Sequence, residues 1–203
     1  MAPYLIVPGW GGSEPDHWQS QWERELVGAT RVEMPDWFNP RRSDWLGTLD
    51  HAIRAASEPP VLIAHSLGCL AVAHWARGAP SAVRGALLVA PPDLDRPDSP
   101  GALREFAPAP RDPLPFPSVV VASDDDPYAS VGRVARMARA WRSQLTVMRG
   151  AGHINRESGF GCWSSGRALL RYFDTPAPPG VEPGVEPGVE IEDDDSRFGR
   201  GLD

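Results

Sequence analysis

The first half of the chain contains the stretch Val61-Leu62-Ile63-Ala64-His65-Ser66-Leu67-Gly68-Cys69-Leu70-Ala71-Val72. The apolar run before Ser66 predicts a buried strand, and the apolar residues after Gly68 predict a helix. A sharp strand-to-helix turn of this kind exposes a serine hydroxyl at the edge of a sheet, and it needs small residues on both sides. Gly68 meets that need, and Ala64 stands where a first glycine is usual. Ser66 is therefore a candidate nucleophile, with an ordinary turn as the alternative.

The composition is that of a globular domain. The chain has 203 residues, of which 41% are hydrophobic, and a formal net charge of -7. This acidic balance argues against nucleic acid and anionic membranes as partners, because both require a basic surface. No apolar run approaches the roughly 20 residues that span a bilayer. The beginning of the sequence does not resemble a signal peptide, and two cysteines are too few for a disulfide framework. We expect a cytoplasmic location.

Short apolar runs alternate with amphipathic segments along most of the chain. The predicted strands are residues 4–7, 30–34, 61–65, 86–90, 119–122 and 145–148. The predicted helices are residues 16–26, 67–77, 131–141 and 161–173, with a further helix that Ser43 caps and that ends before Glu58. The fold class is therefore α/β, a three-layer α/β/α sandwich around a parallel sheet of about six strands.

The last part of the sequence differs in character from the rest. Residues 175–203 repeat Gly-Val-Glu-Pro and then carry a run of acids. Proline, glycine and acidic residues cannot bury enough apolar surface to offset the entropy lost on ordering. We therefore assign residues 1–174 to the domain and residues 175–203 to a disordered acidic tail.

Chemically active residues follow four different predicted strands. The glycine-rich loop 9–12 follows the first strand, Ser66 the third, Asp126 the fifth and His153 the last. Because the carboxyl ends of parallel strands meet at one edge of a sheet, we expect these residues to lie together. Their order along the chain, Ser, Asp and then His, is the order found in triads on sheets of this class.

Other polar residues receive a structural or solvated interpretation. His17 is expected to be structural, and His65 is expected to point away from Ser66 with at most a supporting role. The side chains expected to be solvated, in a turn and on a helix face, are Asp124, Asp125, Arg133, Arg136 and Arg142.

Six motifs along the chain are specific in combination. They are Val7-Pro8-Gly9-Trp10-Gly11-Gly12, Asp16-His17-Trp18, Met34-Pro35-Asp36-Trp37, Ala64-His65-Ser66-Leu67-Gly68, Ser123-x-x-Asp126-Pro127 and Gly152-His153-Ile154-Asn155. Together they resemble the small serine hydrolases of the retinoblastoma-binding and YdeN type, a compact branch of the α/β-hydrolase superfamily. The resemblance covers about residues 4–173. It implies a six-stranded parallel core that lacks the superfamily's first two strands, a Ser/Asp/His triad, and little or no lid.

The resemblance and the strand-end positions together predict a serine hydrolase of small esters, thioesters or amides, without a metal or other cofactor. Ser66 is expected to attack the acyl carbonyl, with His153 as its base and Asp126 orienting that base. The backbone N–H groups of Trp10 and Leu67 are expected to hold the oxyanion.

The substrate pocket is expected to be walled by Gly9, Trp37, His65 and Tyr128, beside a long loop at 93–116 that serves as a reduced cap. The expected partner is a small-molecule acyl substrate, and a protein partner stays open. Two alternatives to hydrolysis also stay open. One is a protein-binding module on a weakly active hydrolase scaffold, and the other is acyl-transfer, lyase or peroxidase chemistry on the same triad.

Overall fold

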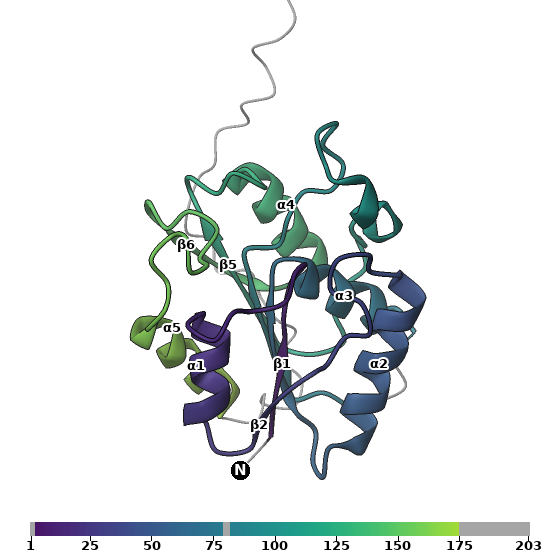
Figure 1. Cartoon of the computed structure of the whole chain (residues 1–203), viewed down its shortest axis with the longest axis vertical. Coiled ribbons are helices and arrows are strands. Elements are labelled where there is room, and N and C mark those ends of the chain that lie inside the picture. Colours follow the sequence, from purple (N-terminus) through teal and green to yellow (C-terminus); the bar gives the residue numbers. More distant parts are fainter. Residues whose placement is uncertain (1–2, 79–81, 175–203) are drawn as a thin grey trace, which may run out of the picture.

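The computed structural model describes residues 3–78 and 82–174, and the predicted tail at 175–203 lies outside them. Within the described residues, six parallel strands form one sheet in the order β2-β1-β3-β4-β5-β6 (Figure 1). The strands are β1 (Tyr4–Val7), β2 (Ala29–Arg31), β3 (Val61–His65), β4 (Gly85–Val89), β5 (Ser118–Ser123) and β6 (Gln144–Met148). The predicted parallel α/β architecture is therefore confirmed.

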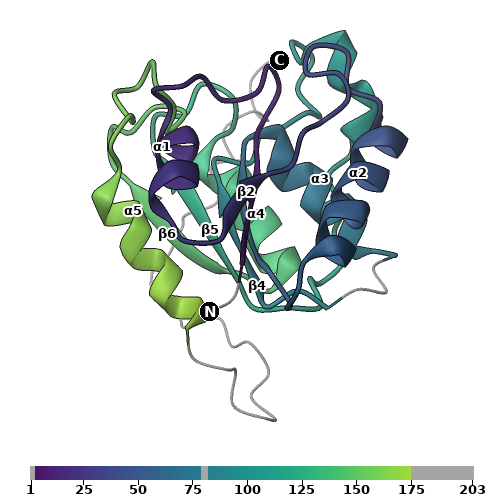
Figure 2. The ribbon, with the colours of Figure 1, turned by 60° about the horizontal axis from the view of Figure 1, so that its bottom comes forward.

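Helices cover both faces of the sheet (Figure 2). One layer holds α2 (Arg42–Ala55), α3 (Leu67–Ala76) and α4 (Val131–Trp141), which share a hydrophobic core with one side of the strands. The other layer holds α1 (Trp18–Glu25), α5 (Ser164–Ala168) and the 3-10 helix η2 (Leu169–Phe173). A second core lies there, centred on Trp18, Trp22 and Trp163.

Burial explains why three strands read as unbroken apolar runs. Every residue of β3, β4 and β5 is buried, because helices pack on both sides of them. The edge strands β2 and β6 keep partly exposed residues and a weaker apolar pattern. In the described part of the chain, no helix is long and apolar enough to cross a membrane.

Several element boundaries differ from those predicted, because contacts between distant segments set them. Helix α2 begins at Arg42 rather than after Ser43, since the Arg42 N–H donates to Glu105 Oε2 at 2.9 Å. Glu105 belongs to η1 (Gly101–Phe106), a 3-10 helix within the predicted loop at 93–116. The second strand ends at Arg31, and the last helical segment starts at Ser164 instead of Gly161.

The expectation that Arg133 lies on a solvated face of α4 is wrong. Its side chain is 18% exposed and pairs with Asp93, with 3.1 Å between Nε and Oδ1, and also with Asp95. These ion pairs fasten the segment after β4 to α4. Arg136 and Arg142 are exposed, as expected.

The direction of strand addition reverses at β1. From β1 the chain adds β2 on one side and β3 on the other, so the switch point lies between β1 and β3. In open α/β sheets, ligands bind outside the carboxyl ends of the strands at such a point. Here those ends carry the loop 8–12 and Ser66.

The turn after β3 is tightly constrained. Ser66 has φ 52° and ψ -123°, a left-handed conformation that costs about 1–3 kcal/mol for a residue with a side chain. A Cβ at Gly68 would lie 2.3 Å from the Val7 carbonyl oxygen and 2.7 Å from that of Pro8. Only glycine lets α3 start this close to the end of β1. Ala64 is fully buried in β3, where its methyl group packs in the core.

We expect Gly68→Ala to destabilise the protein by about 1–3 kcal/mol, because the added methyl group meets backbone that has to move. Gly47→Ala is the matched control, since nothing lies within 4 Å of a Cβ at that exposed position of α2. This control should stabilise the helix by about 0.5–1 kcal/mol. Urea unfolding of both variants measures the difference, and equal stabilities would contradict the close approach at Gly68.

Candidate active site

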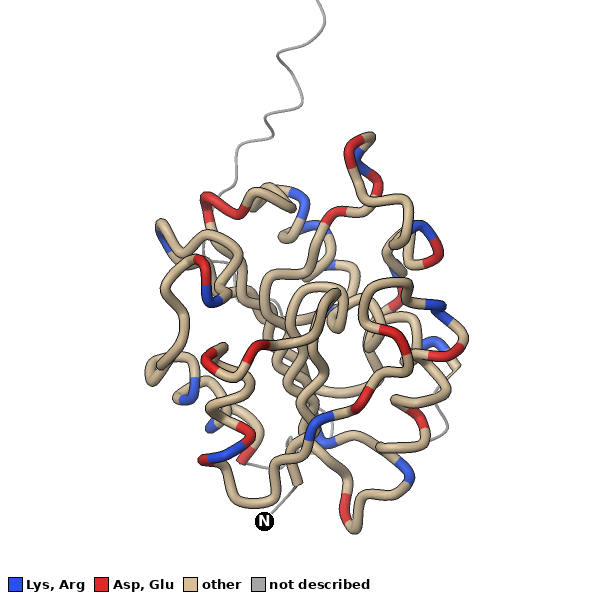
Figure 3. Tube along the Cα trace, in the orientation of Figure 1, with Lys and Arg blue, Asp and Glu red and all other residues tan. Residues whose placement is uncertain are grey.

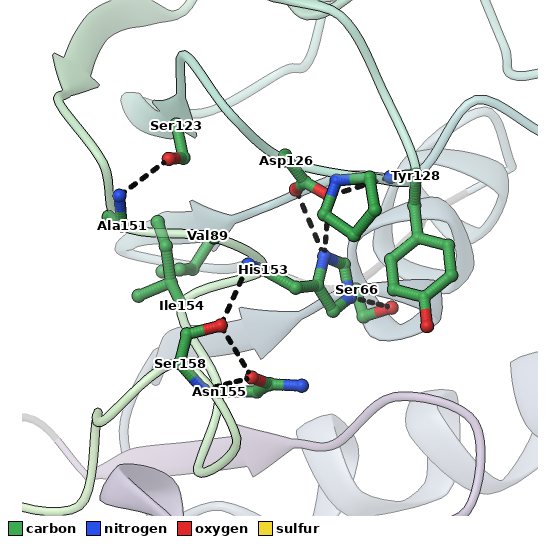
Figure 4. A network of polar contacts seen from close by, with 12 residues as sticks. Ser66, Val89, Ser123, Asp126, Tyr128, Ala151, His153, Ile154, Asn155 and Ser158 are labelled. Carbon is green, nitrogen blue, oxygen red and sulfur yellow. Dashed lines mark hydrogen bonds and ion pairs between the residues drawn. The ribbon is translucent and has the colours of Figure 1, made fainter.

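Ser66, His153 and Asp126 form a chain of hydrogen bonds at the carboxyl edge of the sheet (Figure 4). His153 Nε2 lies 2.9 Å from Ser66 Oγ, and His153 Nδ1 lies 2.9 Å and 3.1 Å from the two Asp126 oxygens. An ionised carboxylate only accepts, so Nδ1 carries the proton and Nε2 is free to accept from the serine hydroxyl. The side chains of His153 and Asp126 are 8% and 2% exposed. The three predicted residues are thus brought together in the order required for proton transfer.

The run of polar residues after β5 holds the loop that carries His153. Three consecutive side chains accept three consecutive backbone N–H groups of that loop. The pairs are Gly150 N to Asp124 Oδ1 at 2.8 Å, Ala151 N to Ser123 Oγ at 3.0 Å, and Gly152 N to Asp125 Oδ1 at 2.7 Å. Ser123 Oγ also donates to Asp125 Oδ1 at 2.6 Å. Asp124 and Asp125 lie exposed in a turn, as expected, and the structure adds that both carboxylates accept hydrogen bonds from the loop that carries His153.

The opposite side of the same loop is fixed by residues from β3 and α1. His65 Nε2 lies 2.9 Å from the carbonyl oxygen of His153, and Trp18 Nε1 donates to the carbonyl oxygen of Ile154 at 2.8 Å. A carbonyl oxygen only accepts, so His65 carries its proton on Nε2. His65 thus supports the loop through the backbone of His153, which is the supporting role expected from the sequence.

Two further histidines near His153 are held neutral. Burial lowers the pKa of His65 well below its ordinary value, and the nearby His153 and His17 lower it further. Burial also lowers the pKa of His17 to about 4, with contributions from Arg31 and His153. Neither ring then adds a positive charge beside His153 near pH 7.

The glycine-rich loop after β1 lies directly against Ser66. A Cβ at Gly9 would meet Ser66 Cβ at 2.8 Å, so this approach also requires glycine. Gly11 N donates to the Trp37 carbonyl at 2.9 Å, which fixes the loop. The backbone N–H groups of Trp10 and Leu67 donate to no residue in the described chain, whereas the Trp10 indole N–H donates to the Phe38 carbonyl at 2.9 Å. Both predicted oxyanion donors are thus available on the loop and at the first residue of α3.

A cavity of about 370 Å³ opens above these groups. Gly9, His65 and Tyr128 line it, as predicted, and the Tyr128 ring packs edge-on to His153 at 4.5 Å between centroids. Trp37 does not line it. Its ring packs beneath the glycine loop, 3.6 Å from where a Gly12 Cβ would be, and against Trp45.

The segment after β4 supplies part of the cavity wall through Pro92, Leu94 and Leu103. A reduced cap at 93–116 is expected beside the pocket from the sequence, but these individual residues are not. His17 and Asn155 also line the cavity. His17 lies beside Trp18 in one of the six motifs, and Asn155 lies two residues after His153 in another. Their presence in these motifs is the signal by which the sequence could have placed them on the cavity wall.

Comparisons with known proteins show which family and which folds this chain is similar to. A model of the family described as serine hydrolase matches residues 4–172. The curated protein YdeN of Bacillus subtilis, assigned as a hydrolase, is 35% identical over 74 residues, which is 34% of this chain and 39% of that protein. Among solved structures, a YdeN-like hydrolase from Pectobacterium atrosepticum is 33% identical, with 85% of this chain and 90% of that chain covered and a TM-score of 0.77. The ydeN product of B. subtilis is 24% identical, with coverages of 86% and 99% and a TM-score of 0.72.

Asp125 provides a pH-dependent test of the loop contacts. Hydrogen bonds from Ser123 and Gly152 hold the pKa of Asp125 below its ordinary value of 3.8, so folding favours the ionised form. That stability is present above pH 3.8 and is lost as the pH falls through the folded-state pKa. We expect Asp125→Ala to lower the urea midpoint at pH 7, and the gap to wild type to narrow in the most acid range where the protein stays folded.

Glu33→Ala is the control for this experiment, because it removes an exposed carboxylate far from the His153 loop in the sequence. Its midpoint should track wild type at every pH. A gap for Asp125→Ala that stays constant down to pH 3 would contradict a stabilising role for the charged carboxylate.

Proposed function

This chain belongs to the serine hydrolase family, and we propose that it cleaves small ester, thioester or amide substrates through an acyl-enzyme on Ser66. The chain is a hydrolase with an α/β-hydrolase fold, which it shares with a lipase from Paleococcus ferrophilus at 14% identity and a TM-score of 0.62. The observation that carries the proposal is the unbroken hydrogen-bond chain from Ser66 to Asp126 at the base of the cavity.

In the first step, Ser66 Oγ attacks the acyl carbonyl carbon while His153 Nε2 takes the hydroxyl proton. The 2.9 Å separation of these two atoms supports direct transfer. The imidazolium that forms is stabilised by Asp126, whose carboxylate already bonds Nδ1. The strained backbone of Ser66 holds Oγ out of the turn, so the attack needs no rearrangement of the elbow.

The carbonyl oxygen gains negative charge in this step, and two backbone N–H groups stabilise it. Leu67 supplies one at the start of α3, where the helix dipole also favours negative charge. Trp10 supplies the other from the glycine-rich loop. Loss of one such donor costs about 3 kcal/mol of transition-state stabilisation.

Collapse of the tetrahedral intermediate expels the leaving group, which receives the proton from His153 and leaves the acyl group on Ser66. His153 then takes a proton from water as that water attacks the acyl carbonyl. The second tetrahedral intermediate releases the carboxylic acid, and the proton returns to Ser66. The two half-reactions use the same base and the same oxyanion donors.

The cavity supports a small substrate. At about 370 Å³ it is near the lower end of the range for small-molecule sites. Acidic and basic residues are interspersed over the described chain (Figure 3), which does not favour a nucleic-acid partner. Acyl transfer to an alcohol would proceed through the same acyl-enzyme. Adding methanol during ester turnover measures the fraction of acyl groups that are transferred to the alcohol rather than to water.

We expect Ser66→Ala to abolish ester hydrolysis, and Asp126→Asn to lower kcat by about four orders of magnitude, because the amide favours the wrong tautomer of His153. The measurement is para-nitrophenyl ester hydrolysis across a series of acyl chain lengths. It also reports the preferred acyl size.

Asp125→Asn is the matched control, because it changes the adjacent carboxylate and keeps the Oδ1 atom that accepts from Gly152. Its kcat should fall far less than that of Asp126→Asn. If Asp125→Asn were the more damaging change, the assignment of the triad acid would be wrong, and turnover by Ser66→Ala at the wild-type rate would exclude the mechanism.

A further inference from the structure

Two polar groups on the cavity wall take no part in the steps above. They are the ring of His17, at the start of α1, and the side-chain amide of Asn155, which follows His153 on the same loop. The protein makes a hydrogen bond to one polar atom of each side chain. That bond determines that the other polar atom of the side chain is a hydrogen-bond donor.

His17 presents a hydrogen-bond donor. The residue is 2% exposed, and its Nδ1 accepts from the backbone N–H of Gln19 at 3.1 Å, which caps α1. An accepting Nδ1 cannot carry a proton, so the proton of the neutral ring is on Nε2. No residue of the described chain accepts from Nε2. Because burial lowers the pKa of His17 to about 4, the neutral form is present near pH 7.

Asn155 also presents a donor. Its Oδ1 accepts from both the backbone N–H and the hydroxyl of Ser158, at 3.0 Å and 2.9 Å. With the oxygen fixed in this way, the amide nitrogen is directed away from Ser158, as Figure 4 shows. No residue of the described chain accepts from this nitrogen.

The protein holds these two residues in one region. Trp18, next to His17, donates its indole N–H to the carbonyl of Ile154, next to Asn155, at 2.8 Å. The Trp18 backbone N–H donates to the Phe160 carbonyl at 3.2 Å, which joins the same two segments again. The His17 ring also lies 5.0 Å from that of His65, which lies 4.9 Å from that of His153. Both donors are therefore positioned by the framework that positions the base.

We propose that His17 and Asn155 form a polar subsite that binds an uncharged acceptor oxygen of the substrate, such as a ketone, ether or hydroxyl oxygen away from the scissile bond. This inference rests on the proposed hydrolase function. Two neutral donors match an oxygen acceptor, and a buried donor left unpaired in the complex would be costly. The charged residues that line the cavity are Glu14, Asp93, Asp98 and Arg96, and Arg96 is paired with Asp98. This acidic balance disfavours a carboxylate, so the acceptor is uncharged.

The test uses pairs of nearly isosteric esters that differ in one acceptor oxygen. In the acyl portion the pairs are para-nitrophenyl levulinate with isocaproate, and methoxyacetate with butyrate. In the alcohol portion the pair is methoxyethyl acetate with butyl acetate. The readout is the ratio of kcat/KM within a pair, compared between wild type and variant, so that the different intrinsic reactivities of the esters cancel.

Two substitutions at His17 separate its two atoms. His17→Asn places an oxygen near the Nδ1 position and keeps the helix cap, but it removes the Nε2 donor. His17→Gln places an amide near the Nε2 position and loses the cap. We expect His17→Asn to lower the ratio of oxygen-bearing to isosteric ester by about three- to tenfold in at least one pair. His17→Gln should keep more of that ratio while lowering the melting temperature further.

Asn155→Asp provides a second test, because it retains the oxygen that binds Ser158 and replaces the donor with an acceptor. The same ratio should fall. His51→Asn, at an exposed position of α2, is the control and should leave every ratio unchanged.

The outcomes separate this inference from the proposed function. Ester hydrolysis that Ser66→Ala abolishes, with ratios in all pairs unchanged by His17→Asn and Asn155→Asp, would overturn the subsite alone. Failure of wild type to hydrolyse any ester, or hydrolysis that survives Ser66→Ala, would overturn the proposed function and the subsite with it.

Discussion

The close approach of α3 to the end of β1 is the contact on which the site depends. Because Gly68 has no side chain, the first turn of α3 lies against the carbonyls of Val7 and Pro8. The chain then reaches the helix through a left-handed Ser66, and Gly9 comes to lie against that serine. One steric requirement thus sets both the backbone turn at Ser66 and the close approach of the glycine-rich loop 9–12. It acts at the switch point of the sheet, outside the carboxyl ends of β1 and β3.

The second half of the site depends on pairing between loops rather than on packing. Three side chains after β5 hold three N–H groups of the His153 loop, and Asp126 holds the imidazole of that residue. Asp126 and His153 are therefore positioned as one unit at the ends of β5 and β6. From the other side, His65 bonds the backbone of His153. Since His65 is adjacent to Ser66, this bond also links the loop that carries His153 to the turn that carries Ser66.

Local sequence patterns predict the strands, the elbow and the order of the site residues, because burial and turn chemistry act over a few neighbouring positions. They do not predict contacts between distant segments. The start of α2 depends on Glu105, and the partners of Arg133 lie near residue 93. Trp37 is an aromatic residue of the kind that often lines pockets, yet it packs beneath the glycine-rich loop. The hydrogen bond that Asp125 accepts from Gly152 is not predicted, because 27 positions separate the two residues.

The central claim is that Ser66 is a nucleophile activated by His153 and Asp126. The most direct test is to treat the folded protein with a fluorophosphonate and to locate the adduct by peptide mass spectrometry. The account predicts one adduct per chain on Ser66, formed much more slowly in Asp126→Asn and absent in Ser66→Ala. A folded wild-type protein whose Ser66 stays unlabelled, or whose adduct lies on another residue, would contradict it.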